Sequence, residues 1–320
     1  MIVNSPQLII SRGGATVAVS LGSEVTLVDV GDGSQRVVKA ATTASIVGLA
    51  PTGGHIPAVA GGFELSWLAG DPAGPVVQLP GQAMFVRLSD EGTVVVLTRS
   101  DSHGTRLCVY GGDDLAEAFV PLALGHSSAN AVEFDSAGSV VMAGLNRTRS
   151  SDPGEHYVRQ VDWTEGHASV TWGGDGMPND VDLVRASAGH LVVSRGRQIL
   201  TSSIAALAKS GVSDGKSSEI DGEIETLAIS PNGSSICIVV DGDDGLQVLS
   251  RSFGGARMAV RGAFPAGVSA VAAAIGDDGT VVVAGLRSAT EVVIAVAPPK
   301  GPLVERWQVD QPRSVFRDDR

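Results

Sequence analysis

The sequence contains few of the features that define several common protein classes. Only two cysteines, Cys108 and Cys237, occur in 320 residues, too few for the disulfide framework on which small secreted domains depend. Apolar runs stay well below the roughly 18 to 20 residues of a spanning helix. The segment before Gly14 lacks a basic stretch followed by an apolar one and a cleavage site. We therefore expect a soluble, cytoplasmic chain with two buried thiols.

Basic residues are also scarce. Lys and Arg total 23 against 35 Asp and Glu, a formal net charge of −12, and only four of the 23 are lysine. Nucleic acids and anionic membranes are both bound through a surplus of basic side chains. The composition therefore predicts no nucleic-acid partner and no membrane partner. Abundant Ala, Gly, Val and Asp are typical of a bacterial chain from a GC-rich genome.

Glycine, by contrast, is plentiful and recurs at regular intervals. The clearest copies of a repeated hairpin span 227–240 and 272–284, each with an apolar strand, a polar turn that contains glycine, and a run of β-branched residues. Equivalent turns are marked by Gly14, Gly54, Gly92, Gly138, Gly189, Gly233 and Gly279. Their mean separation, about 44 residues, is the spacing of propeller blades. Such turns require positive φ, which glycine adopts without a Cβ clash.

The repeat predicts an all-β fold, a seven-bladed β-propeller of four-stranded antiparallel blades. Second strands such as Thr93–Leu97 and Thr280–Ala284 are continuously apolar, which requires burial on both faces of a sheet. Radial blades provide that burial. The alternative, an open two-layer sandwich, leaves one face of each sheet exposed and predicts strands in which apolar and polar residues alternate. We expect one domain over residues 1–310 and a charged C-terminal tail over 311–320.

Two local features modify this expectation. A short helix is predicted near 202–209, capped by hydroxyl residues at its start and docked by Ile204, Leu207 and Ala208. Ring closure has two alternatives. Either Leu303–Val309 forms the fourth strand of the last unit, or Met1–Val3 supplies it, which leaves Trp307 and the charged stretch Arg313–Arg320 as a free docking tail.

The pattern resembles the WD40-like β-propeller superfamily over essentially the whole chain. Gly-His dipeptides occur at 54–55, 125–126, 166–167 and 189–190, but no Trp-Asp dipeptide ends any unit. The family's side-chain network is therefore not transferred to these residues. The resemblance implies a toroid whose relatives mostly hold proteins together.

Loops of the expected rim are the candidate binding surface. The rim comprises 100–105, the polar insertion 146–156, 241–245 and 287–290, and long surface loops often carry binding functions. The side chains predicted to contact a protein partner, on this rim or in the tail, are Arg147, Arg149, Glu155, His156, His103, Asp243, Arg287 and Trp307. The leading hypothesis is a non-enzymatic interaction scaffold, a subunit of a larger bacterial complex.

No catalytic, cofactor-binding or metal site is predicted. The stretch Gly211–Gly215 matches a nucleophile pattern, but it lacks the strand before and the helix after that expose such a serine. The six histidines never fall at the short spacing of a metal pair. The alternative function is a propeller enzyme or small-ligand binder, of hydrolase or lactonase type, with a divalent metal in the central channel. It requires Asp, Glu, His and Asn side chains to gather at one mouth of the axis.

Overall fold

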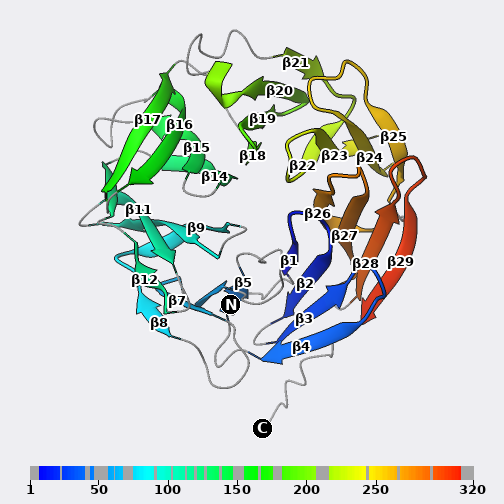
Figure 1. Cartoon of the computed structure of the whole chain (residues 1–320). Coiled ribbons are helices and arrows are strands. Elements are labelled where there is room, and N and C mark those ends of the chain that lie inside the picture. Colours follow the sequence, from blue (N-terminus) through cyan, green and yellow to red (C-terminus); the bar gives the residue numbers. More distant parts are fainter. Residues whose placement is uncertain are drawn as a thin grey trace.

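The fold is an all-β ring of radial sheets around a central opening (Figure 1). The computed structural model describes residues 7–21, 24–39, 44–46, 57–60, 62–67, 75–89, 92–101, 104–111, 114–118, 121–125, 128–136, 139–146, 155–164, 167–175, 182–206, 216–242, 245–264, 267–288 and 291–310. The WD40-like propeller expectation is confirmed at the level of the fold.

Within each four-stranded sheet the strands follow one another in chain order, from the channel outward. The first half of the ring contains β1 (Gln7–Ile10), β2 (Thr16–Leu21), β3 (Glu24–Asp29), β4 (Gln35–Lys39), β5 (Ala44–Ile46), β6 (Pro57–Ala60), β7 (Glu64–Trp67), β8 (Val76–Gln78), β9 (Gln82–Leu88), β10 (Val94–Ser100), β11 (Gly104–Gly111), β12 (Ala116–Glu117) and β13 (Leu122–Gly125). The second half contains β14 (Ser128–Ser136), β15 (Ser139–Asn146), β16 (Glu155–Thr164), β17 (His167–Asp175), β18 (Leu183–Ser187), β19 (His190–Arg195), β20 (Gln198–Ser203), β21 (Lys216–Glu219), β22 (Glu223–Ile229), β23 (Ser235–Gly242), β24 (Gly245–Ser252), β25 (Ala259–Ala263), β26 (Ser269–Ile275), β27 (Val281–Ser288), β28 (Glu291–Ala297) and β29 (Val304–Asp310).

The prediction of seven four-stranded blades needs a correction. Six sheets, β1–β4, β5–β8, β14–β17, β18–β21, β22–β25 and β26–β29, have four strands, whereas the sheet β9–β13 has five. In that sheet β12 and β13 both pair with β11, so the outermost position is divided between them. Pro121 stands immediately before β13. A proline has no N–H to donate to the ladder, which explains the break.

The hydrophobic core lies between neighbouring sheets. One cluster joins Val95 and Leu97 of β10 to Phe134 and Met142 of the next sheet, and a second joins Val17 and Val19 of β2 to β27 and β28. Five consecutive residues of β10 and five of β27 are buried. Burial on both faces was the reason to prefer radial blades to a sandwich, and it is confirmed for these strands. Cys108 and Cys237 are buried free thiols.

The turns between first and second strands adopt the predicted glycine geometry. Positive φ is found at Gly14 (79°), Gly92 (85°), Gly189 (76°), Gly233 (71°) and Gly279 (84°). In four of these turns the glycine amide donates to the carbonyl three residues earlier: Gly14 to Ser11 (2.8 Å), Gly92 to Ser89 (3.2 Å), Gly233 to Ser230 (2.8 Å) and Gly279 to Gly276 (3.0 Å). Gly54 and Gly138 lie outside the described residues.

Neighbouring turns are also joined by hydrogen bonds. The Gly189 amide donates to Asp135 Oδ1 at 2.8 Å, and the Ala188 amide donates to the Asp135 carbonyl at 3.1 Å. The Ser187 hydroxyl donates to the Pro231 carbonyl at 2.5 Å, and the Asn232 amide donates to Asp277 Oδ1 at 2.8 Å. These bonds fix the angle between successive blades where the turns meet.

Asp135 makes this linkage pH-dependent. Burial raises the pKa of its carboxyl, an effect that the Gly189 amide and Arg12 partly oppose. Because the folded pKa lies above the unfolded one, stability falls as the pH rises between the two values. D135N keeps a hydrogen-bond acceptor without the buried charge. We therefore expect its free energy of unfolding at pH 7 to equal or exceed that of wild type, and we expect any such difference to disappear toward pH 4. D135A removes the acceptor and should lose about 1 to 2 kcal/mol. Urea unfolding of the three proteins at both pH values checks this, and a D135N protein less stable than wild type at pH 7 contradicts it.

Ring closure follows the first alternative. β29 pairs with β28 and is the fourth strand of the last sheet, so Trp307 is not part of a free tail. Its ring lies within 2.6 Å of the position that a Cβ on Gly33 would occupy, and its indole N–H donates to the Val30 carbonyl at 3.1 Å. The first and last sheets therefore close the ring by packing and hydrogen bonding.

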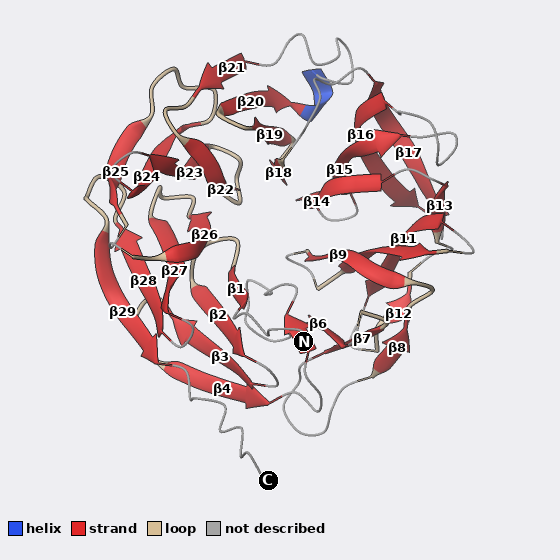
Figure 2. Cartoon of the chain, turned by 180° about the vertical axis from the view of Figure 1, so that it is seen from behind, coloured by secondary structure: helices blue, strands red, loops and turns tan. Residues whose placement is uncertain are grey.

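The predicted helix begins later than expected. Thr201–Ser203 continue β20, and a helical turn covers 204–206 (blue in Figure 2). Ser203 Oγ accepts the Ala206 amide at 3.1 Å, which is the expected hydroxyl cap, and Ile204 is buried. Leu207 and Ala208, and the Gly211–Gly215 stretch, lie outside the described residues. No described helix is long and apolar enough to span a bilayer.

Candidate functional site

The predicted rim corresponds to the connections between second and third strands. The last residue pairs before these connections are Ser100 with Gly104, Asn146 with Glu155, Gly242 with Gly245 and Ser288 with Glu291. Glu155 and His156 belong to β16. Arg147, Arg149, His103 and Asp243 lie outside the described residues.

Arg287 is the predicted rim residue whose contacts are described. Its guanidinium donates to Glu291 at 2.6 Å and to Glu305 at 2.8 Å. These two hydrogen bonds raise the pKa of Arg287. One arginine between two carboxylates gives the cluster a net charge of −1. At this part of the rim Arg287 is therefore accompanied by a surplus of carboxylate, and its role in partner binding stays a prediction.

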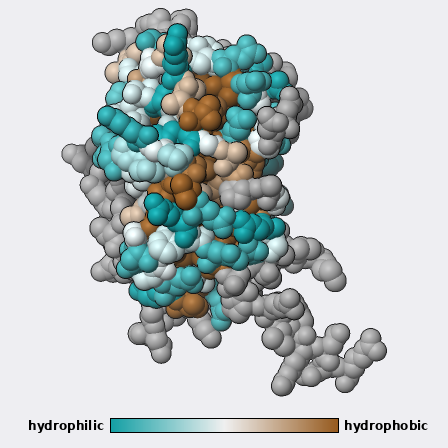
Figure 3. Space-filling model, turned by 90° about the vertical axis from the view of Figure 1, so that its right-hand side faces the viewer, coloured by the Kyte–Doolittle hydropathy of each residue, from teal (hydrophilic) through white to brown (hydrophobic). Residues whose placement is uncertain are grey.

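The outer face over the last sheets offers no single apolar surface in the view of Figure 3, where hydrophobic groups are separated by hydrophilic ones. The exposed hydrophobic residues of these sheets include Val260 on β25, 69% exposed, and Val304 on β29, 45% exposed. Isolated exposed aliphatic residues of this kind are ordinary on protein surfaces. We therefore place no candidate site there.

A pocket of about 470 Å³ occupies the central channel. Its walls come from the innermost strands β1, β9, β14, β18, β22 and β26. These strands surround the opening in Figures 1 and 2. Its lining combines the side chains of three arginines and a glutamate with apolar ones, so we take the channel as the candidate site for ligand binding.

One layer of the channel is built from equivalent positions of the repeat. The first turn of each blade opens at Ser11, Ser89, Asp135, Ser187, Ser230 or Gly276, and the residue of this layer lies two positions before it. We call this set the channel layer, and its described members are Ile9, Arg87, Glu133, Arg185, Ala228 and Ala274. Three consecutive blades thus contribute charged side chains, and the next three contribute small or aliphatic ones.

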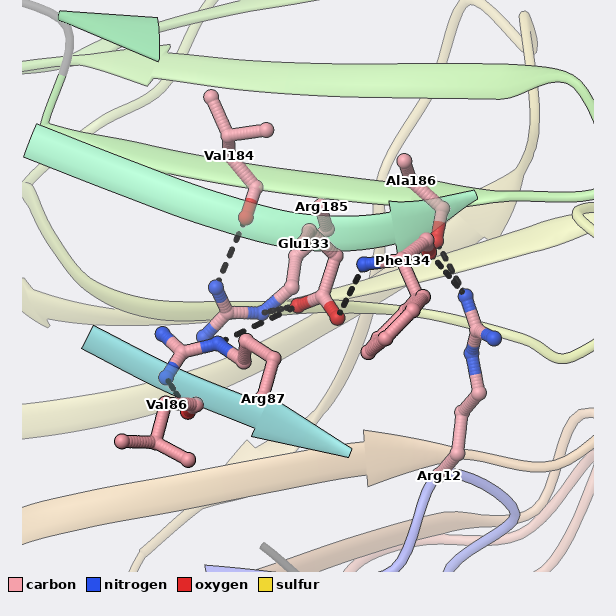
Figure 4. A network of polar contacts seen from close by, with 8 residues as sticks. All are labelled: Arg12, Val86, Arg87, Glu133, Phe134, Val184, Arg185 and Ala186. Atoms are coloured by element: carbon pink, nitrogen blue, oxygen red, sulfur yellow. Dashed lines mark hydrogen bonds and ion pairs between the residues drawn. The ribbon is translucent and has the colours of Figure 1, made fainter. Parts of the chain in front are cut away.

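The charged half of the layer holds one carboxylate between two guanidiniums (Figure 4). Glu133 Oε2 lies 4.0 Å from Arg87 Nε and 3.8 Å from Arg185 Nε. Each arginine also donates from Nη1 to the carbonyl that precedes it in its own strand, Arg87 at 2.9 Å and Arg185 at 2.8 Å. Neither Nη2 group has a hydrogen-bond partner among the described residues. The three side chains are partly accessible, with 31% of Arg87, 25% of Arg185 and 17% of Glu133 exposed.

Burial lowers the pKa of Arg185, and the neighbouring Arg87 lowers it further, whereas Glu133 opposes the shift. The two guanidiniums and one carboxylate of the layer carry a net charge of +1, which favours an additional negative charge beside them.

Arg12 reaches the same region from the opposite side of the ring. It lies in the turn after β1, and its Nη2 donates to the Phe134 carbonyl at 3.0 Å and to the Ala186 carbonyl. These acceptors belong to β14 and β18, so a single side chain connects the first blade with two blades across the channel (Figure 4). Arg12 thus lines the pocket while its guanidinium is committed to the backbone.

Sequence analysis missed these four residues because no local motif contains them. The signal for Arg87, Glu133 and Arg185 is present in the repeat, since counting back two positions from each turn aligns them, whereas Arg12 lies within its own turn. The side chains required by the divalent-metal alternative do not gather in this pocket, where the described lining carries three arginines and one glutamate. Among the described residues, no group of three or more His, Cys, Asp or Glu side chains has the placement of a metal site.

Comparisons with known proteins support the fold. No protein-family model and no curated protein matches the sequence. Solved structures do match. The propeller of "Complex of KlAtg21 with coiled-coil of AgAtg16" has a TM-score of 0.70 at 10% identity and covers 96% of this chain and 100% of its own. "Kluyveromyces lactis Hsv2" has a TM-score of 0.62 at 14% identity, with 96% and 100% covered.

An enzyme complex is among the similar structures too. A chain of "Kuenenia stuttgartiensis Hydrazine Synthase" matches with a TM-score of 0.60 at 13% identity, covering 93% of this chain and 96% of its own. At these identities the likeness establishes the fold alone. The function has to be argued from the surfaces of this chain.

Proposed function

We propose that this chain, whose fold is that of the WD40-type β-propellers, is a non-enzymatic protein-interaction scaffold and a subunit of a larger bacterial complex in the cytoplasm. The supporting observation is the unequal length of the rim connections. β15 and β16 are joined by residues 147–154, whereas β23 and β24, and β27 and β28, are joined by two residues each. A long loop that is held by a rigid scaffold is typical of binding loops.

Charge indicates the kind of partner. The chain carries a formal net charge of −12, and the Arg287 cluster on the rim has a surplus of carboxylate. Complementary potentials speed association and suppress wrong partners. The partner proposed here presents basic residues to the acidic rim and acidic residues to Arg147 and Arg149. The similar structure that contains a coiled coil of AgAtg16 shows a propeller of this fold with a protein partner.

Affinity capture from the native host with quantitative mass spectrometry tests the proposal. Wild type should capture a stoichiometric partner, and the double variant R147E/R149E should bind it at least about tenfold more weakly, because several charge contacts change sign. K300E is the matched control, since Lys300 is an exposed residue between β28 and β29, outside the rim connections. Equal capture by R147E/R149E and wild type would refute the rim assignment. A wild-type chain that remains a folded monomer without a partner would refute the scaffold.

A further inference from the structure

The channel pocket has a cationic side and an apolar side, and this division points to a ligand. We propose that the channel binds a small organic monocarboxylate with an apolar body, whose carboxylate lies on Arg87 and Arg185. This inference is independent of the rim and of any protein partner. It differs from the metal-dependent alternative because it assigns the channel to an anion.

The charge of the site sets the charge of the ligand. Arg87, Arg185 and Glu133 sum to +1, and Arg12, whose guanidinium donates to two backbone carbonyls, adds a further positive charge to the described lining. The pocket therefore favours an anion, and its carboxylate lies on Arg87 and Arg185 because Arg12 Nη2 is engaged by the backbone. A cation would meet guanidiniums of like charge, and inorganic phosphate has no apolar group to lie against Ile9, Ala228 and Ala274.

Hydrogen-bonding capacity remains available for that anion. Separations of 3.8 and 4.0 Å between Glu133 and the two Nε atoms are longer than hydrogen bonds. The Nη2 groups of both arginines have no acceptor among the described residues. A carboxylate accepts from such guanidinium groups in the planar, two-point geometry that favours arginine.

The apolar side determines the rest of the ligand. Ile9, Ala228 and Ala274 complete the described channel layer opposite the charged blades, and Val271 of β26 also lines the pocket. Met84 of β9 lines it as well and is 49% exposed. A volume of about 470 Å³ lies in the range of small-molecule pockets, which are mostly apolar with a few placed polar groups. An alkyl or aryl group of a few carbons fits this wall.

Calorimetric titration of the full chain with sodium hexanoate tests the assignment, with hexylammonium and inorganic phosphate as comparison ligands. We expect saturable one-to-one binding of hexanoate, and binding of the other two at least about tenfold weaker. R87Q removes a cationic donor and should weaken hexanoate binding about tenfold or more. E133Q removes the competing carboxylate and should strengthen it by about the same factor. R195Q, which replaces an exposed arginine at the end of β19, should change nothing.

R87Q and E133Q are expected to change the affinity for hexanoate in opposite directions, which keeps the test decisive. A variant that fails to fold loses affinity, but misfolding does not produce the tighter binding expected of E133Q. The proposal is overturned if hexanoate shows no saturable binding to wild type and E133Q, or if E133Q leaves the affinity unchanged. It is equally overturned if hexylammonium or phosphate binds as tightly as hexanoate. Partner capture by the rim is unaffected by any of these results.

Discussion

Replacing Gly33 with alanine is expected to destabilise the fold by about 2 to 5 kcal/mol, the sum of backbone strain and overpacking. Gly33 has a φ of 75°, and a Cβ there would lie 2.6 Å from two ring carbons of Trp307. Those two residues meet where the first and last sheets close the ring. Urea unfolding, followed by tryptophan fluorescence and circular dichroism, measures the loss.

G92A separates the two causes. Gly92 has a φ of 85°, but nothing lies within 4 Å of its added Cβ, so G92A should show the strain alone, about 1 to 2 kcal/mol. W307L relieves the clash, so the loss caused by G33A should be smaller in the W307L background than in wild type. Equal losses for G33A and G92A would contradict the proposed packing of Trp307 on the first blade.

Arg12 is the second position where a large effect is expected. R12A removes a guanidinium that donates to the carbonyls of Phe134 and Ala186 across the channel. Hydrogen bonds to charged groups contribute about 1.5 to 3 kcal/mol each, and they are not fully additive. We therefore expect R12A to lose about 2 to 4 kcal/mol in urea unfolding.

R12K provides the comparison for Arg12. Lysine keeps the charge and can donate to two carbonyls, but its nitrogen lies one bond nearer the backbone than Arg12 Nη2, so an intermediate loss is expected. R195Q controls for the removal of an arginine at an exposed site. An R12A protein within about 0.5 kcal/mol of wild type would be indistinguishable from an ordinary surface substitution. That result would contradict the connection across the ring.

The repeat made much of the fold predictable, because local turn chemistry is read directly from the sequence. Five of the turn glycines that define the repeat are described, and all five have positive φ. The continuously apolar second strands are buried, as two-faced coverage requires. The division of the outer strand in β9–β13 was missed, although Pro121 carries a signal for it. The helix start was misplaced because Thr201–Ser203 pair with β19, a tertiary effect without a local signature.

The channel site was harder to predict. Arg87 and Glu133 are 46 residues apart, and Glu133 and Arg185 are 52 apart, so no motif search unites them. Arg287, predicted from the sequence as a partner contact, is held by Glu291 and Glu305, two contacts that the sequence pattern did not indicate. Trp307 was a candidate for a docking tail until Gly33 and Val30 were seen to hold it. The Trp307 contacts depend on first and last sheets that meet only when the ring is closed, and the Arg287 contacts depend on the pairing of β27, β28 and β29 within one sheet.

Anomalous diffraction from crystals of the full chain soaked with 6-bromohexanoate tests the central claim most directly. The closed ring predicts a bromine peak in the channel beside Ile9, Ala228 and Ala274, with the carboxylate density on Arg87 and Arg185. Arg87, Glu133 and Arg185 should converge from three neighbouring blades. A peak elsewhere on the protein, an empty channel at saturating ligand, or inner strands that do not surround one axis would contradict the account.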